Sequence, residues 1–238
     1  MLLRCGMTKS WVVLIIAAAG IITMVPACQA SPLGGTVLTN PGNTVLPSLV
    51  VEPAGTLLAS IVAPYSFVTT GGTTSGTLTS AVFRNASGTL DFYYQVSNDA
   101  SSATQIARET DSDFNGFTIW TGVRTDAVGP FVASTHAPIT ADRSPAGTLV
   151  GFSFTPPDSA KIPPGSTSSI LVISTLATDY RAGDASVIDG GTQTVASFGP
   201  FSPISPTPEP TTTLLIGVGL AAVASLRRQR RAEAQLTS

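Results

Sequence analysis

Residues 90–97 read LDFYYQVS. Two sets of side chains alternate along this stretch, Leu90, Phe92, Tyr94 and Val96 in one set and Asp91, Tyr93, Gln95 and Ser97 in the other. Because successive side chains of a β-strand point to opposite faces, this alternation predicts a strand with one buried face. We expect the first set to face the core and Tyr93 to face outward.

The residues around this strand predict more strands. Residues 77–84 precede it, and the turn-forming sequence Asn85-Ala86-Ser87-Gly88 joins the two as a β-hairpin. Further candidates are rich in Thr, Val, Ile and Phe: residues 56–63, 103–109, 116–124, 147–154, 168–177 and 192–198. Short strands separated by Gly- and Pro-rich turns predict an all-β fold. We expect a single antiparallel β-sandwich over residues 56–198, Ig-like or jelly-roll-like.

The first 30 residues have the three parts of a secretory signal peptide. Arg4 and Lys9 precede an uncharged apolar run over residues 11–25, and small residues follow as far as Ala30. We therefore expect a signal helix that is cleaved after Ala30. Two alternatives are an uncleaved membrane anchor, for which the run is short, and lipidation of Cys28.

Charge and cysteine content limit what the exported part can do. The chain has two cysteines, Cys5 and Cys28, and both lie in the signal peptide, so a chain starting at residue 31 has no disulfide and no thiol nucleophile. Residues 31–205 carry six positive and twelve negative side chains, a net charge of −6, which argues against nucleic acid as a partner. Residues 31–55 contain four prolines and predict an extended segment able to add an edge strand.

The C-terminal end contains a second hydrophobic segment. A Pro-rich stalk over residues 199–207 leads to Pro208, Glu209 and Pro210, and an uncharged segment over residues 211–226 follows. Four arginines come next: Arg227, Arg228, Arg230 and Arg231. As a helix the apolar segment is about 24 Å long, a little short of the ~30 Å hydrocarbon core. We expect a transmembrane helix whose arginines stop transfer and stay cytoplasmic.

This order of a Pro-Glu-Pro triplet, a short apolar helix and an arginine cluster resembles the PEP-CTERM sorting signal of Gram-negative bacteria. The resemblance covers residues 206–238, with the sorting signal proper at residues 208–238. It implies recognition by exosortase, a membrane protease-transpeptidase that removes the helix and the basic end. It also implies an inner-membrane precursor, a final place in the cell envelope, at the surface or outside the cell, and an association with exopolysaccharide and biofilm. The alternative is a plain single-pass anchor.

One stretch of the central region resembles half of a metal site. Asp111, Asp113, Asn115 and Gly116 match the first half of a calcium loop, in which alternating oxygens converge on the ion. Gly122 stands where such a loop places its bidentate glutamate. The two interpretations are a calcium site formed by Asp111, Asp113 and Asn115 and an acidic turn between strands.

The remaining residues do not indicate an enzyme. His136, the single histidine, has no metal-ligating neighbour, and no G-x-S-x-G motif occurs. Two interpretations stay open for Asp91, Asp142 and Asp158: they are turn and surface residues, or they include paired carboxylates for sugar hydrolysis, which pair in space and leave no sequence motif. Tyr93 and Trp120 would offer a stacking surface for sugars if exposed, and core packing is the alternative.

These observations predict an exported protein of structural or adhesive type at the cell surface or in the extracellular matrix. It requires no cofactor, and exosortase and extracellular polysaccharide are its expected partners. The alternatives are a carbohydrate- or calcium-binding sandwich and a secreted enzyme that acts on polysaccharide.

Overall fold

The computed structural model describes residues 33–201. The expected signal helix with its cleavage site at Ala30, the transmembrane helix, the Pro-Glu-Pro triplet and the arginine cluster lie outside these residues. The described part is all-β, apart from one 3-10 turn at Asp158–Ala160. No helix within residues 33–201 is long and apolar enough to cross a membrane.

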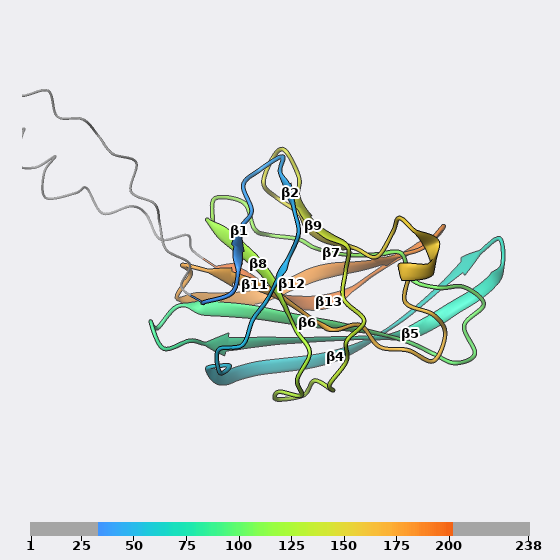
Figure 1. Cartoon of the computed structure of the whole chain (residues 1–238), viewed down its shortest axis with the longest axis horizontal. Coiled ribbons are helices and arrows are strands. Elements are labelled where there is room, and N and C mark those ends of the chain that lie inside the picture. The colour runs from blue at the N-terminus through green and yellow to red at the C-terminus, as the bar shows by residue number, and fades with distance from the viewer. Residues whose placement is uncertain (1–32, 202–238) are drawn as a thin grey trace, which may run out of the picture. The chain divides into compact units, whose positions relative to one another are not determined.

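Thirteen strands form two sheets (Figure 1). Sheet A has the order β1-β8-β11-β6-β5-β4, and β3 also pairs with β8. Its strands are β1 (Val37–Leu38), β3 (Ser48–Leu49), β4 (Thr56–Thr69), β5 (Gly72–Arg84), β6 (Leu90–Asn98), β8 (Ile119–Arg124) and β11 (Ile170–Thr175). Sheet B has the order β13-β12-β7-β10-β9-β2. Its strands are β2 (Thr44–Val45), β7 (Arg108–Asp111), β9 (Thr140–Arg143), β10 (Val150–Ser153), β12 (Asp179–Ile188) and β13 (Thr192–Phe201).

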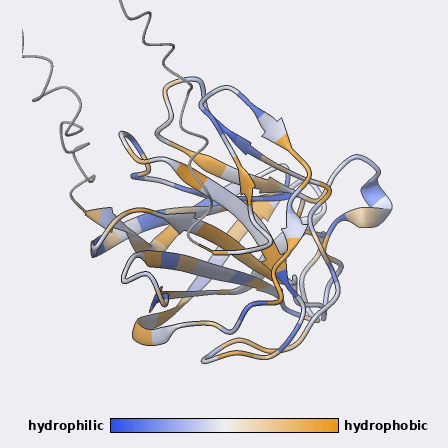
Figure 2. Ribbon diagram, turned by 60° about the vertical axis from the view of Figure 1, so that its left-hand side comes forward, coloured by the Kyte–Doolittle hydropathy of each residue, from blue (hydrophilic) through white to orange (hydrophobic). Residues whose placement is uncertain are grey.

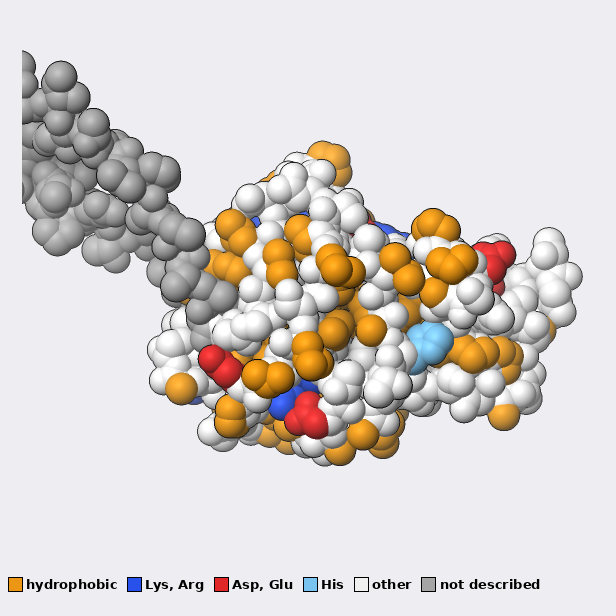
Figure 3. Space-filling view, in the orientation of Figure 1, with side chains coloured by type: hydrophobic (Ala, Val, Ile, Leu, Met, Phe, Trp, Pro, Cys, Tyr) orange, Lys and Arg blue, Asp and Glu red, His pale blue; other side chains and the backbone are white. Residues whose placement is uncertain are grey.

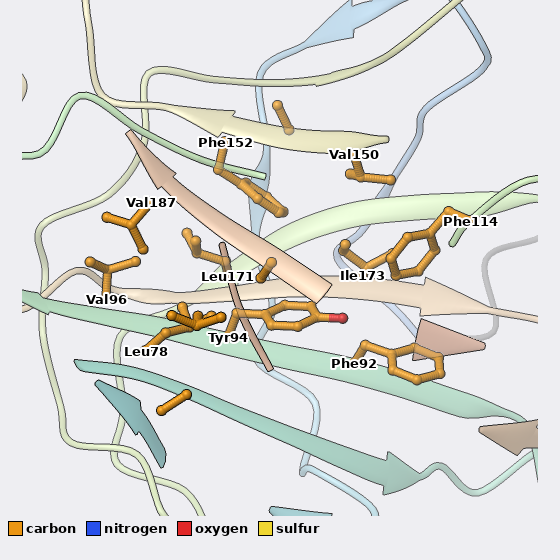
Figure 4. Packing of buried hydrophobic residues seen from close by; sticks show 14 of the residues in the cluster. Leu78, Phe92, Tyr94, Val96, Phe114, Val150, Phe152, Leu171, Ile173 and Val187 are labelled. Carbon is orange, nitrogen blue, oxygen red and sulfur yellow. The ribbon is translucent and has the colours of Figure 1, made fainter. Parts of the chain in front are cut away.

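The two sheets share one hydrophobic core, so the arrangement is sandwich-like. Leu90, Phe92, Tyr94 and Val96 of β6 belong to this core, which confirms the expected inward set. From sheet B, the core includes Val150, Phe152, Ala185, Val187 and Val195 (Figure 4). Hydrophobic positions accordingly gather on the strands in the middle of the molecule (Figure 2).

The outer face of β6 is buried, whereas the alternation along the strand predicted one buried face only. Tyr93 is fully buried, in an outer cluster that also contains Leu33, Val50, Ala81, Phe83, Phe131, Ile170 and Val172. Its ring centroid is 4.7 Å from that of Phe83. Sheet A is therefore buried on both faces here, because the N-terminal segment and the loop around Phe131 cover its outer side. Trp120 is buried as well, so of the two interpretations of these rings the structure supports core packing and not an exposed stacking surface.

The strand pairing follows the expectation with one exception. The β5–β6 ladder confirms the hairpin around residues 85–89, and the other ladders are antiparallel except for β3, which pairs with β8 in parallel. β1 and β3 extend the same sheet through contacts with β8, while β2 between them pairs with β9 of sheet B. The N-terminal segment thus adds short strands to both sheets.

Two strands were not predicted from the sequence, and some strand ends differ from those expected. β9 and β12 were not expected at all, because sequences such as DYRAGDASVI lack clean alternation of apolar and polar residues. β13 continues to Phe201, so the first residues of the expected Pro-rich stalk belong to the sheet. Hydrogen bonding to a neighbouring strand, rather than local periodicity, decides these boundaries.

Candidate functional site

The last strand connects the domain to the C-terminal segment. β13 pairs with β12 along its full length, from the pair Ile188–Thr192 to the pair Asp179–Phe201. The Tyr94 hydroxyl, which reaches across from sheet A, donates a hydrogen bond of 2.6 Å to the Phe198 carbonyl (Figure 4). The strand from which the C-terminal segment continues is therefore held by a long ladder and by a bond through the core.

The three residues of the candidate calcium loop lie in different surroundings. Asp111 is the last residue of β7 and is fully buried. Asp113 has a φ of 74° and places its Oδ1 3.1 Å from Arg181 Nη2, while Asn115 is exposed. Asp113 thus already has a cationic partner, and no group of three His, Cys, Asp or Glu side chains suited to a metal occurs within the described residues. The calcium interpretation stays a prediction.

Asp111 has a buried acidic neighbour that the sequence did not single out. Glu109 lies two residues earlier in β7, on the same face of the strand, and is also fully buried. Their strand neighbours on β10 and β12 are Val150, Phe152, Ala185 and Val187, all members of the core. Burial raises the pKa of both carboxyl groups, and the charge of Glu109 raises that of Asp111 further. The core therefore favours their neutral, protonated forms.

Beside Asp113 the surface has an open pocket of about 570 Å³. Its lining combines charged, amide, hydroxyl and aromatic side chains: Asp113, Asn115, Phe117, Thr148, Arg181, Pro200 and Phe201. The guanidinium carbon of Arg181 lies 6.0 Å from the ring centroid of Phe201, which is half-exposed. An aromatic ring beside polar groups is an arrangement that suits an uncharged polar ligand such as a sugar.

We expect the melting temperature of the protein to be unchanged by a chelator or by a reductant. Asp113 is already paired with Arg181, Asp111 faces the core, and residues 33–201 contain no cysteine. The measurement is thermal unfolding with calcium, with chelator and with reductant. A large drop on chelation would assign Asp111, Asp113 and Asn115 as calcium ligands, because a ligand that binds the folded state stabilises it.

The other acidic residues considered for catalysis are distributed widely. Asp142 forms a bidentate pair with Arg108 at 2.6 and 2.8 Å, and Asp158 pairs with Lys161 at 3.1 Å. Asp91 is fully buried in β6, so of the two interpretations left open for it, that of a turn or surface residue does not apply. It accepts hydrogen bonds from Ser174 Oγ at 2.6 Å and from Asn85 Nδ2 at 3.2 Å. Two hydrogen bonds offset part of the cost of burying this carboxyl group.

His136 lines a second open pocket, of about 380 Å³, together with residues 132–135, 166 and 167. Its Nε2 lies 2.8 Å from the Ala160 carbonyl oxygen, and its ring packs near Phe154. This face of the molecule shows few charged side chains around the histidine (Figure 3). The contacts with the Ala160 carbonyl and with Phe154 hold the imidazole ring in place.

The comparisons with known proteins concern the C-terminal end. A family model described as the PEP-CTERM protein-sorting motif matches residues 206–231. This chain carries a PEP-CTERM sorting motif. No curated protein and no solved structure matches the chain.

The PEP-CTERM motif begins five residues after β13 ends at Phe201. It contains Pro208, Glu209 and Pro210, the apolar segment and the four arginines, which are the residues on which the resemblance rests. Motifs of this kind are in general recognised by exosortase-type processing enzymes, and they indicate export with sorting to the envelope or surface. The β-domain is thus the part of the chain that this motif sorts.

Proposed function

We propose that the β-domain is a structural or adhesive component of the cell surface or the extracellular matrix, released from an inner-membrane precursor by exosortase. The observation that carries the proposal is the PEP-CTERM motif at residues 206–231, which directly follows the domain. The long β12–β13 ladder and the Tyr94–Phe198 bond support it, because they fix the strand that connects the domain to the motif.

The placement of the acidic residues also favours a role without catalysis. Glu109 and Asp111 are two carboxyl groups on one face of one strand, and both are buried in the core, where a polysaccharide cannot reach them. Asp142 and Asp158 are each paired with a basic side chain. A secreted enzyme that acts on polysaccharide would need two accessible carboxyl groups on either side of the bond to be cleaved.

Expression in a host with exosortase tests this role. We expect the wild-type chain to be accessible to protease added outside the cells, and its deletion to reduce cell–cell aggregation and matrix retention. A chain ending at residue 205 lacks the motif and should be exported without being retained. Wild-type protein that shortened the host polysaccharide would contradict the structural role and support the enzyme.

A carbohydrate-binding module is the second candidate, and the pocket beside Asp113 favours it. Phe201 and Arg181 form one wall, so Phe201→Ala and Arg181→Ala should each weaken retention on the host exopolysaccharide by about tenfold, roughly 1.4 kcal/mol. Thr192→Ala, an exposed change at the other end of β13, serves as the matched control. Equal retention of all four proteins in co-sedimentation would show that this pocket does not bind the polysaccharide.

A further inference from the structure

The N-terminal segment covers sheet A through few contacts. We call residues 33–55 the strap. Leu33 and Val50 bury their side chains in the outer cluster, and the amides of Thr39 and Val50 donate to the carbonyls of Ile119 and Val123 at 3.0 and 2.8 Å. Most other strap residues are half-buried or exposed, and its strands are two residues long. The two-residue ladders β1–β8 and β3–β8 tie it to sheet A, and β2–β9 ties it to sheet B. A segment held by such short ladders and few buried side chains belongs to the less stable part of a fold.

Asp91 lies on the face of sheet A that the strap covers. It precedes Tyr93 by two residues in β6, so both side chains point to the outer side. Its Oδ1 accepts the bonds from Ser174 and Asn85, and no described residue hydrogen-bonds to its Oδ2. The end of the strap also lies close to this part of sheet A. A Cβ added at Gly55 would lie 1.8 Å from the carbonyl oxygen of Arg84, which pairs with Leu90 beside Asp91.

The charged groups around Asp91 do not neutralise it. Glu52 of the strap carries a negative charge that opposes ionisation of Asp91, and it accepts a 3.0 Å hydrogen bond from the Gly34 amide. Arg124 of β8 donates to the Glu52 carbonyl and pairs with Asp126 of the following loop at 2.7 Å. Arg84 of β5 lines a pocket of about 530 Å³ with Glu52 and Asn85.

The remaining neighbours bring no positive charge. β11 contributes the uncharged Ser174, and Tyr93 of β6 contributes a phenol. Within the described residues, no ion pair joins Asp91 to any basic side chain. An ionised Asp91 under the closed strap would therefore be a buried charge without a counter-charge, which is costly.

We propose that the strap is a pH-sensitive cover, which stays on sheet A while Asp91 is neutral and loosens when Asp91 loses its proton. Opening of the strap gives the carboxylate access to water and moves Glu52 away from it. It also exposes the apolar side chains of the outer cluster. The strap therefore couples the proton concentration outside the cell to the exposure of one face of the domain.

The direction in which pH changes the closed-to-open ratio of the strap follows from the pKa of Asp91 in the two forms. Burial raises the pKa of Asp91 to about 6, and the charge of Glu52 adds to this, while the bonds from Ser174 and Asn85 act in the opposite direction. An exposed aspartate has a pKa of about 3.9. Between about pH 4 and pH 6 the open form releases a proton that the closed form keeps, so the closed-to-open ratio falls as pH rises, by up to roughly 100-fold. Above pH 6 both forms are ionised and the ratio levels off.

Amide hydrogen exchange of the mature protein recovered from its host tests this cover. Protection factors, corrected for the intrinsic exchange rate at each pH, are measured between pH 4 and pH 7 for residues 33–55. Residues 179–201, which form β12 and β13 of the other sheet, are the internal reference. We expect strap protection in the wild type to fall by one to two orders of magnitude while the reference stays constant.

Three variants test whether Asp91 and Glu52 cause the pH dependence of strap protection. Asp91→Asn places an amide where the neutral acid has its hydroxyl, so its strap protection should not depend on pH. Glu52→Gln removes the opposing charge and should shift the midpoint to lower pH. Asp184→Asn, an exposed acid on β12, should behave like the wild type.

Several results would contradict the proposal that the strap is a pH-sensitive cover. The proposal fails if the wild type and Asp91→Asn respond equally to pH. It also fails if the strap and the reference lose protection together, because that pattern is global unfolding, to which the buried Glu109 and Asp111 would contribute. If Asp91→Asn does not fold, an NMR titration of the wild-type Asp91 carboxyl group decides. Ionisation near pH 6 would support the cover, and ionisation near pH 4 would exclude it.

Discussion

Replacing Tyr93 by alanine is expected to lower the free energy of unfolding by about 3–5 kcal/mol, as much as replacing Phe92. Phe92 fills the core between the sheets and packs edge-to-face against Phe114. Tyr93 fills the outer cluster, between Phe83 and Phe131. Both rings are fully buried, so both truncations leave a cavity. Urea denaturation of the two variants and the wild type measures the effect.

Matched variants distinguish burial from other effects of the change. Tyr93→Phe keeps the ring and should retain most of the stability. Leu33→Ala removes a strap residue from the same cluster and should also destabilise the protein, by about 2–5 kcal/mol. A loss for Tyr93→Ala of less than about 1 kcal/mol, beside a large loss for Phe92→Ala, would mean that the outer face of β6 is open to solvent.

The second large expected effect is processing of the C-terminal tail: we expect the mature protein to lack residues 211–238. We expect the arginines to keep the end of the apolar segment in the cytoplasm while the β-domain lies outside, which would place Pro208, Glu209 and Pro210 near the outer face of the membrane. Proline cannot continue a helix, so the triplet offers extended backbone to a processing enzyme. In a host with exosortase, intact-mass analysis should find the precursor and a form without the tail.

Substitutions in the motif should stop this processing. Pro208→Ala together with Pro210→Ala should leave an uncut, membrane-retained precursor. Pro203→Ala changes a proline outside the triplet and should be processed normally. Neutral residues in place of the four arginines should disturb retention before cleavage. Recovery of wild-type protein from the medium or envelope with residues 211–238 intact would leave the plain membrane anchor as the explanation.

The C-terminal motif could be recognised in the sequence because its chemistry is local. Proline restricts its own backbone, an apolar run partitions into a bilayer, and an arginine cluster stays in water, whatever the rest of the chain does. The same holds for the inward face of β6, where four alternating apolar residues decide which side is buried. Strands β9 and β12 were missed because hydrogen bonds to neighbouring strands define them.

The burial and the partners of the acidic residues could not be predicted from the sequence. Asp111 and Asp113 are two residues apart and look equivalent in the sequence, yet one faces the core and the other pairs with Arg181 of a distant strand. Glu109 attracted no interpretation, although it shares the core face with Asp111. Neither difference has a local signal, because each depends on which strand lies beside β7.

By itself, the sequence determined that the fold is all-β, which face of β6 is inward and that the chain ends in a PEP-CTERM sorting motif. Only the tertiary structure decided that Tyr93 and Asp91 are buried. Tyr93 packs with residues of the strap and of the loop around Phe131, and Asp91 bonds to Ser174 of β11 and to Asn85. Alternation along a strand reports which side chains share a face. Whether that face meets water depends on chain segments far away in the sequence, and their position is a property of the whole fold.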